Sequence, residues 1–360
     1  MTGLDPEAAA ERILAAAEAA LGAPRRLTEG PEAVLAGAGP DAYTFSVDTD
    51  DERWSGQLVA RTSPVEVLER ESRWIGAVGA LGHPVPELLH DHPDHGVLVF
   101  RPPGGENLVN LMTTELMALP ELLATFGRMH ARLHALPVDG LAATGNGGGA
   151  GTGTGTGDGN DPAPGNEDAD ADVEVEVDLD DPVEELADLA AGLGIRKSVD
   201  RELGWLRAQR DVGANGSAVV CHGDLHPVHV FVWRGDEPRE LVVNWTRARL
   251  EAPAFDVAGT LVSFWTGPLF VANVAQRTML KMARDSLASA YQTAYEGAAD
   301  PLDPAGLSYW QAFHLAAFGV HLVDVLQGEA IDPWHPAANV PQPEKALQDV
   351  RNHFWELAES

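Results

Sequence analysis

The stretch from Cys221 to Trp245, CHGDLHPVHVFVWRGDEPRELVVNW, constrains the fold most, because it places acids and histidines between two apolar runs. The runs SAVV, just before it, and ELVVNW, at its end, are typical of buried strands, and we expect them to pair. Asp224 and His229 lie five residues apart, and Asn244 follows the second run. At the mouth of such a pair these side chains allow two interpretations, ordinary turn chemistry or a base with two metal ligands.

The charge of the chain excludes some partners. It has 55 acidic and 24 basic residues, with a formal net charge of −31, so nucleic acid and anionic membranes are poor partners. Lysine occurs only at positions 197, 281 and 345, and arginine supplies the other positive charge. Such a surface suits a cytosol at very high salt, where screening reduces self-repulsion. A surface selected for cationic substrates is the alternative.

Cysteine usage and the amino terminus bear on the compartment. Cys221 is the only cysteine, which excludes an internal disulfide and favours a reducing cytoplasm, and we expect it to be a small buried filler. Residues 1–22 have helical apolar spacing and lack the pattern of a signal peptide. No apolar run reaches the length of a membrane span. We therefore expect a cytoplasmic protein with no membrane partner.

Residues 142–181 differ in texture from the rest of the chain, with glycine and threonine first and acids after. Such a segment buries too little apolar area to offset its ordering entropy, which predicts a disordered insertion. Its tail, DVEVEVDLD, alternates with period two, so an edge strand is the alternative. Its glycines do not form a phosphate loop, because no lysine or hydroxyl residue follows in the required place.

Two differently patterned regions flank the insertion. Before it, residues 42–48 and 54–62 predict strands, residues 65–82 a helix and residues 84–105 two further short strands. The pattern over 111–136 is helical, with Pro120 starting a second segment, and another helix is expected around 183–209. The fold class is therefore α+β with two lobes: an N-terminal helix over 1–26, a small antiparallel-sheet lobe over 27–105, and a larger helical lobe over 106–141 and 182–360.

The spacing within the opening stretch suits phosphoryl transfer. That reaction requires mainly positioning and charge neutralisation. In the protein-kinase catalytic loop a histidine stands two residues before the catalytic aspartate and a metal-binding residue five after it. His222, Asp224 and His229 have this spacing.

HGDLHPVH followed by VVNWTRARLEAPAFDVA resembles the aminoglycoside phosphotransferase and choline kinase superfamily, which has a protein-kinase-like fold. Histidine at 229 and the continuation NWTRARLEAPAFDVAGTLVSFW are most similar to macrolide phosphotransferases. The resemblance covers about residues 30 to 340 without the insertion and is strongest over 221–258. It implies transfer of the γ-phosphoryl group of ATP or GTP to a hydroxyl of a small acceptor. With the acidic composition, a haloarchaeal source is expected.

The resemblance also implies roles in the larger lobe. Asp224 would be the catalytic base, His222 would brace its loop, and Asp256 would hold that loop from the following helix. His229 and Asn244 would occupy the two positions that bind Mg²⁺.

In the small lobe, the resemblance places Arg61 where relatives commonly have the phosphate-binding lysine. Arginine can bind phosphate through a fork of donors. Glu71 would pair with Arg61, and Glu69 is the competing choice on another helix face.

Two further segments would meet the nucleotide. Gly30, Gly37 and Gly39 would allow close backbone approach in a nucleotide-covering turn. Residues 99–105, VFRPPGG, would be the hinge that meets the base.

Asn244 departs from the family, which ordinarily has aspartate there. Magnesium prefers charged oxygen, so Asn244 with His229 predicts weak metal binding. A catalytically weak or inactive nucleotide-binding pseudokinase is the alternative function. A metal-dependent hydrolase, the third hypothesis, requires a closely spaced histidine cluster that the sequence lacks.

Other candidates have structural explanations. His130 and His134 lie four apart on one helical face, as in some metal sites, but packing beneath the loop is expected because the sequence shows no third ligand nearby. Trp265 and residues 309–326 are expected to line the core, and some of their aromatics to floor an acceptor pocket.

The composition predicts salt-dependent folding. We expect the chain to unfold in dilute buffer and to refold in molar KCl, because screening removes the repulsion among its acids. Circular dichroism across a salt series measures this. Full stability without salt would contradict it.

Overall fold

A computed structural model describes residues 6–22, 25–33, 42–91, 95–138, 141, 181–234, 239–328, 337 and 339–359. The insertion, apart from Asp181, lies outside these residues, as do Gly37 and Gly39. The expectations for those positions therefore remain predictions.

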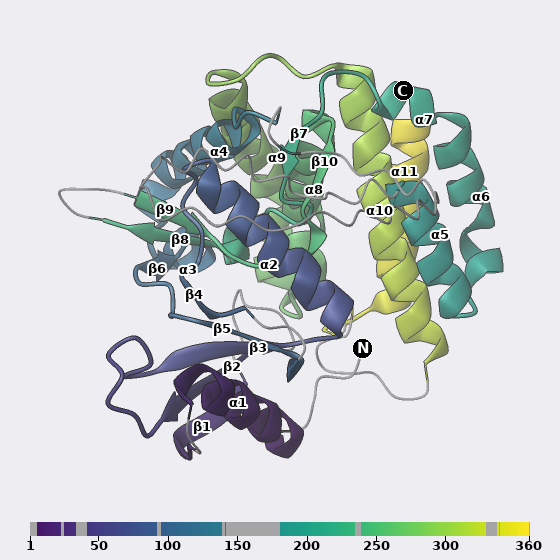
Figure 1. The fold of residues 1–360 in the computed structure, drawn as a ribbon. Coiled ribbons are helices and arrows are strands. Elements are labelled where there is room, and N and C mark those ends of the chain that lie inside the picture. The colour runs from purple at the N-terminus through teal and green to yellow at the C-terminus, as the bar shows by residue number, and fades with distance from the viewer. Residues whose placement is uncertain are drawn as a thin grey trace, which may run out of the picture.

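The smaller lobe is an antiparallel sheet with a helix on each face (Figure 1). Its strand order is β1-β2-β3-β5-β4, with bounds Leu27–Ala33, Ala42–Val47, Leu58–Thr62, Val97–Phe100 and Leu88–His90. Helices α1 (Pro6–Leu21) and α2 (Val65–Ala80) cover the sheet.

Strand β5, an interior strand of the sheet, shows why both helices are needed. Val97 and Val99 join the core that includes Ile13 of α1, while Leu98 and Phe100 join the core that includes Trp74 of α2. Successive strand residues point to opposite faces, so a continuous apolar run requires cover on both sides.

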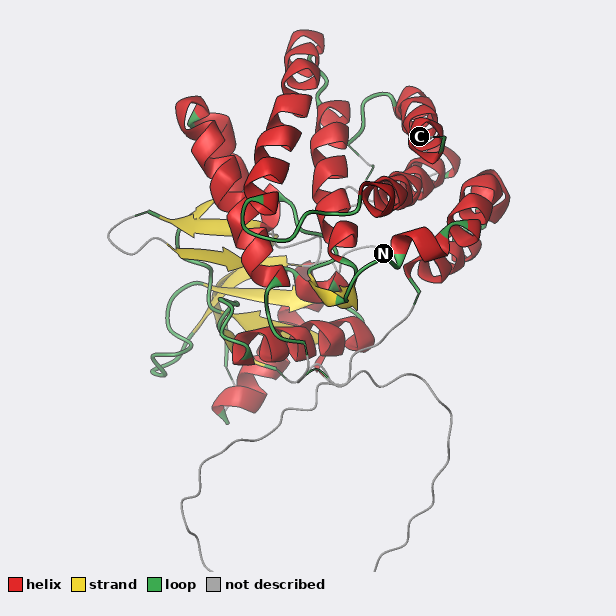
Figure 2. Cartoon of the chain, turned by 90° about the horizontal axis from the view of Figure 1, so that it is seen from above, coloured by secondary structure: helices red, strands yellow, loops and turns green. Residues whose placement is uncertain are grey.

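The larger lobe is mainly helical (Figures 1 and 2). Its helices are α3 (Leu108–Thr114), α4 (Leu119–His134), α5 (Pro182–Gly192), α6 (Arg196–Ala208), α7 (Arg210–Gly213), α8 (Pro253–Thr266), α9 (Val274–Glu296), α10 (Pro304–Gln327) and α11 (Pro343–Ala358). The single helix expected around 183–209 is two helices, because Gly194 turns the chain with a positive φ of 71°. Residues of α10, among them Tyr309, Trp310 and Phe313, line the core as expected.

Two small sheets carry the opening stretch, and they correct the expected pairing. Strand β7 (Val219–Cys221) pairs with β10 (Arg249–Glu251), whereas β8 (Val230–Trp233) lies between β6 (Glu106–Asn107) and β9 (Arg239–Val242). The two apolar runs therefore do not pair with each other. The run at 240–245 pairs with the adjacent β8 through a short connection, which costs less loop entropy.

The sequence predicted the two-lobed α+β fold correctly.

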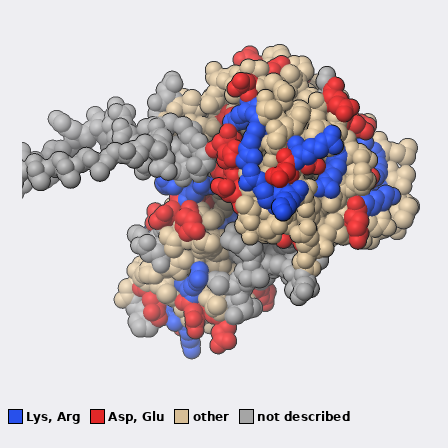
Figure 3. All heavy atoms as spheres, turned by 90° about the vertical axis from the view of Figure 1, so that its right-hand side faces the viewer, with Lys and Arg blue, Asp and Glu red and all other residues tan. Residues whose placement is uncertain are grey.

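Cys221 is buried in β7, where burial raises the pKa of its thiol well above the ordinary value. In the described part of the chain, no helix is both long and apolar enough to cross a membrane. On the face shown in Figure 3, basic and acidic side chains intermingle. One such ion pair joins Arg207 of α6 to Glu184 of α5 at 2.6 Å.

Candidate active site

The loop that carries Asp224 leaves β7 through a glycine. Gly223 has a φ of 80°, and a Cβ there would collide with the carbonyl oxygen of Arg247. Only glycine meets both requirements without strain. The sharp turn directs the next residue, Asp224, out of the strand.

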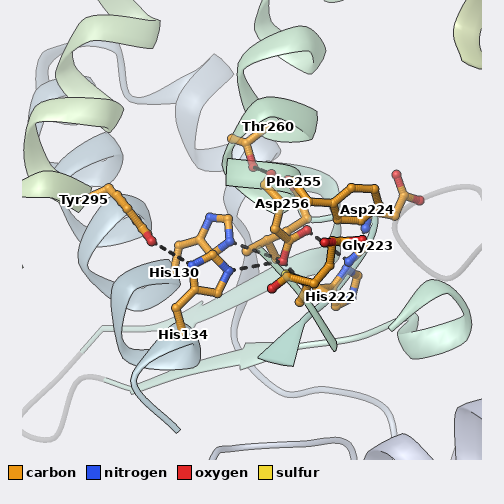
Figure 4. A network of polar contacts seen from close by, with 12 residues as sticks. His130, His134, His222, Gly223, Asp224, Phe255, Asp256, Thr260 and Tyr295 are labelled. Carbon is orange, nitrogen blue, oxygen red and sulfur yellow. Dashed lines mark hydrogen bonds and ion pairs between the residues drawn. The ribbon is translucent and has the colours of Figure 1, made fainter. Parts of the chain in front are cut away.

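Asp256, near the start of α8, holds this loop from below (Figure 4). Its Oδ2 accepts a hydrogen bond from His222 N at 2.6 Å, and its Oδ1 accepts one from Gly223 N at 2.9 Å. The carboxylate is 1% exposed. Two hydrogen bonds to one ionised carboxylate fix the backbone immediately before Asp224.

Two histidines of α4 complete the environment of Asp256. His130 Nε2 lies 3.2 Å and His134 Nε2 3.6 Å from its Oδ2. On their other side, His130 Nδ1 lies 2.5 Å from the hydroxyl of Tyr291, and His134 Nδ1 lies 2.7 Å from that of Tyr295. The histidines therefore pack beneath the loop, as expected, and bridge α9 to the loop anchor.

The protonation states in this cluster follow from burial. Burial lowers the pKa of His130 to about 4, so the ring is neutral and one nitrogen donates to Asp256 while the other accepts from Tyr291. Burial alone would raise the pKa of Asp256, but hydrogen bonds from His130 and His134 hold it well below the ordinary value. Asp256 is thus an ionised carboxylate stabilised by hydrogen bonds, one of them from the neutral ring of His130.

The sequence showed no third metal-ligand candidate near His130 and His134, but the structure places Asp256 there. One ligand atom from each of these three residues lies within 4.8 Å of the other two. The oxygens of Asp256 already accept hydrogen bonds from the loop and from His130, which favours an anchor over a metal site. The two tyrosines were missed as well. Tyr291 and Tyr295 are four residues apart, as are the histidines they contact, and this matched spacing on two helices was the available signal.

The carboxylate of Asp224 is partly exposed, at 38% of its side chain. His222 braces the loop: its Nδ1 accepts from Asp224 N at 3.3 Å and its Nε2 donates to Val243 O at 3.0 Å. Burial would raise the pKa of Asp224, but electrostatic interactions with the neighbouring His226, His229 and Arg247 outweigh burial and lower that pKa. Asp224 is therefore ionised at neutral pH and can accept a hydrogen bond from a hydroxyl.

Asn244 connects the two lobes. Its Oδ1 accepts hydrogen bonds from Arg61 Nη1 at 2.7 Å and from Thr246 Oγ1 at 3.1 Å. Since a guanidinium only donates, the amide NH₂ must face His229 Nε2, which lies 2.9 Å away and accepts. The Nδ1–H of His229 then donates to the carbonyl oxygen of Asp224, 2.8 Å away.

These bonds test the fit of magnesium to the expected ligands. His229 and Asn244 are adjacent, as expected, but both are neutral and each uses its ligand atom in a hydrogen bond within the site. A hard cation prefers anionic oxygen and octahedral geometry. The pair therefore does not fit a tightly held Mg²⁺ ion.

Arg61 of β3 and Glu71 of α2 form a buried ion pair, with Nε and Oε2 3.1 Å apart and side-chain exposures of 9% and 2%. Glu69 lies on the exposed face of α2. Glu71 also accepts from Trp245 N at 3.2 Å, so it links both lobes. Burial raises the pKa of Glu71, and Arg61 and the Trp245 amide oppose that rise.

A cavity of about 580 Å³ lies beside Asn244. Its walls come from β2, β3, the segment after β5 and α3, and include Thr44, Val59, Arg61, Glu71, Phe100, Pro102, Gly105, Asn107 and Phe231. The expected hinge, residues 99–105, thus contributes most of one wall. Volume and mixed apolar and polar lining suit a ligand of nucleotide size.

Gly30 was expected in a nucleotide-covering turn but lies in a paired strand, and Asn107 was not predicted as a site residue. Gly30 has a φ of 77° in β1, where a Cβ would collide with Thr44 O of β2, so it serves strand pairing. Asn107 caps α3, and its Nδ2 donates to Val228 O at 2.6 Å, which ties the hinge segment to the catalytic loop.

Comparisons with known proteins identify the class of this fold and site. The phosphotransferase enzyme family matches residues 32–305, and the chain belongs to that family. No curated protein sequence matches the chain.

Solved structures share the fold at low sequence identity. A Ralstonia eutropha JMP134 protein assigned as an aminoglycoside phosphotransferase is 16% identical with a TM-score of 0.54, covering 93% of each chain. A choline/ethanolamine kinase family protein from Mesorhizobium loti is 16% identical with a TM-score of 0.51, covering 92% of this chain and 94% of that one. The amicoumacin kinase hAmiN, solved with AMP-PNP, Ca²⁺ and Ami, is 14% identical with a TM-score of 0.52, covering 98% and 95%.

The buried neutral His130 predicts a pH dependence of stability. Its pKa is about 4 when folded and about 6.5 when unfolded, so between these values the unfolded chain binds more protons. The free energy of unfolding should therefore decrease as the pH falls from about 6.5 to about 4, by up to about 1.4 kcal/mol per pH unit from this residue. Urea unfolding at pH 7 and pH 5.5 measures the slope.

The variant His130→Gln should reduce that slope, and His353→Gln, at a partly exposed position of α11, should leave it unchanged. An identical slope in wild type and His130→Gln would contradict the assignment of a neutral His130.

Proposed function

We propose that the chain transfers the γ-phosphoryl group of ATP or GTP to a hydroxyl of a small molecule. The observation that carries the proposal is an ionised, partly exposed Asp224 on a loop fixed by Asp256, joined through His229 to Asn244 on the wall of the cavity between the lobes. Family membership supports the reaction class. The nucleotide analogue held by hAmiN supports a nucleoside triphosphate as co-substrate.

In this proposal the base of the nucleotide occupies the cavity along residues 99–105, and its phosphates extend toward Arg61. The acceptor oxygen attacks the γ-phosphorus, the bond to the bridging β–γ oxygen breaks, and the hydroxyl proton passes to Asp224. Arg61 neutralises phosphate charge, and Glu71 positions Arg61. His222 and Asp256 act by fixing the loop.

The weak metal binding expected from the sequence bears directly on the proposed reaction. A divalent cation, when bound with the nucleotide, would neutralise phosphate charge. His229 and Asn244 can offer it only neutral ligands, so we infer that any Mg²⁺ is weakly held. This favours a slow kinase, and a nucleotide-binding pseudokinase is the second candidate.

The acceptor substrate, the source and the cellular location are inferred from the sequence alone. Similarity to macrolide phosphotransferases over 221–258 supports a bulky hydroxylated acceptor, and the net charge of −31 supports a halophilic, haloarchaeal source with a cytoplasmic location. A metabolite or sugar alcohol suits such a source as well as a macrolide does.

Removal of the base tests the function. We expect Asp224→Asn to lower the rate of phosphoryl transfer to a responsive alcohol by about 10²–10⁴-fold, since a general base typically contributes that much. Nucleotide-dependent thermal stabilisation should persist. Asp188→Asn, on the exposed face of α5, is the matched control and should keep full activity. Equal activity of Asp224→Asn and wild type would refute the assignment.

The metal position gives a second prediction. Asn244→Asp adds an anionic oxygen beside His229 and Arg61, and we expect it to lower the Mg²⁺ concentration needed for half-maximal ATP turnover by about tenfold, the effect of roughly 1.4 kcal/mol. A Mg²⁺ titration of ATPase activity measures the change. If neither chain turns over ATP and neither is stabilised by nucleotide, both the kinase and the pseudokinase proposals fail.

A further inference from the structure

Basic residues surround the carboxylate of Asp224. The groups that act on it electrostatically are His222, His226, His229 and Arg247, and no acidic group is among them. Burial lowers the pKa of each of the three histidines, so at neutral pH Arg247 is the charged member of this group. His226 Nε2 lies 3.5 Å from Asp224 Oδ1, with 28% of the histidine side chain exposed. Among the described groups that act on Asp224, a polycationic acceptor would therefore find no counter-charge other than the base itself.

Arg247 stands out within this group. It ends the short 3₁₀ helix η4 (Trp245–Arg247), and its side chain is exposed. Its backbone packs against Gly223, so the loop that carries Asp224 and the residue that carries the guanidinium are in direct contact. Among the described residues, the side chain of Arg247 forms no ion pair or hydrogen bond.

An unpaired arginine is notable in a chain with a net charge of −31. Many other arginines bind acidic side chains, among them Arg26, Arg101, Arg132, Arg196, Arg207, Arg210, Arg234, Arg249 and Arg351. The guanidinium of Arg247 thus remains available for a ligand.

The position of Arg247 favours the acceptor over the nucleotide. The nucleotide-sized cavity is lined by Arg61 and Asn244 but not by Arg247. Arg61 is therefore placed to meet the phosphates, while Arg247 lies past Asn244 in the chain, beside the base that receives the acceptor proton.

We propose that Arg247 binds an anionic group of the acceptor, so that the substrate is an alcohol that also carries a carboxylate or a phosphate. A guanidinium binds either group through two parallel N–H donors. The same charge disfavours amino-alcohol acceptors, since like charges at close range repel. This assignment rests on the proposed phosphotransferase function and defines the chemical class of its substrate.

The test uses four six-carbon polyols that differ only at carbon 1: gluconate, sorbitol 1-phosphate, sorbitol and glucamine. The full chain is assayed with ATP at the lowest salt at which it stays folded, and phosphorylated product is measured by mass spectrometry. Binding of each polyol is measured in parallel by thermal shift with ADP present. The two anionic polyols distinguish a carboxylate from a phosphate preference.

We expect the wild type to prefer at least one anionic polyol over sorbitol by about tenfold in kcat/KM or affinity, and to disfavour glucamine. Arg247→Gln should reduce the anionic preference to about twofold or less, and Arg247→Glu should reverse it in favour of glucamine. Arg128→Gln, which removes the same charge from the exposed face of α4, should keep the wild-type preference.

Three outcomes would overturn the proposal. One is a wild-type preference for glucamine, and another is an anionic preference that survives in Arg247→Glu. The third is a rise in the KM for ATP in Arg247→Gln without a change among the polyols, which would assign Arg247 to the nucleotide. Because binding is measured apart from turnover, an inactive chain that still binds nucleotide and discriminates by charge would refute the kinase function and leave the role of Arg247 intact.

Discussion

The buried carboxylate of Asp256 is the interaction on which the site depends. It accepts hydrogen bonds from the backbone N–H groups of His222 and Gly223 and from the neutral imidazole of His130 on α4, so one ion orders two helices and a loop. A buried charge is tolerated only when its oxygens are satisfied, and here they are. These bonds also fix the position of Asp224, because it is the next residue along the loop. Its carboxylate stays ionised and partly exposed while the backbone behind it is fixed.

A second network joins the lobes where a metal was expected. Glu71 of the helix α2 holds Arg61 of the sheet, and Arg61 holds Asn244 of the larger lobe, whose amide bonds His229. His229 and Asn244, which were expected to bind a cation, are bonded to each other, and Asn244 also accepts a hydrogen bond from the guanidinium of Arg61. A fixed organic cation thus lies near where phosphate charge would need neutralisation. This arrangement gives a physical basis for a reaction that depends more on Arg61 than on a tightly held ion.

Charged side chains are unevenly distributed over the chain, and this distribution bears on substrate specificity. The chain is strongly acidic, and many of its arginines bind acidic side chains, such as Arg207 with Glu184 and Arg351 with Glu202. Around Asp224 the balance differs, because the described groups that act on its carboxylate are three histidines, whose pKa values burial lowers, and the unpaired Arg247. Because a charged substrate is discriminated at short range by the groups it contacts, the local balance at the site matters more than the net charge of the chain.

The sequence by itself determined the fold class, the two lobes and the loop, because the spacing of His222, Asp224 and His229 is local and the apolar periodicities are strong. It placed Glu71 beside Arg61 only as one of two choices, and it paired the wrong strands around the loop. Those points depend on contacts between residues far apart in the chain. Tyr291 and Tyr295 meet the histidines of α4 across 161 residues, and Arg61 meets Asn244 across 183. Only packing of the lobes decides which polar groups satisfy one another, since hydrogen bonding acts over a few ångströms in space and takes no account of distance along the sequence.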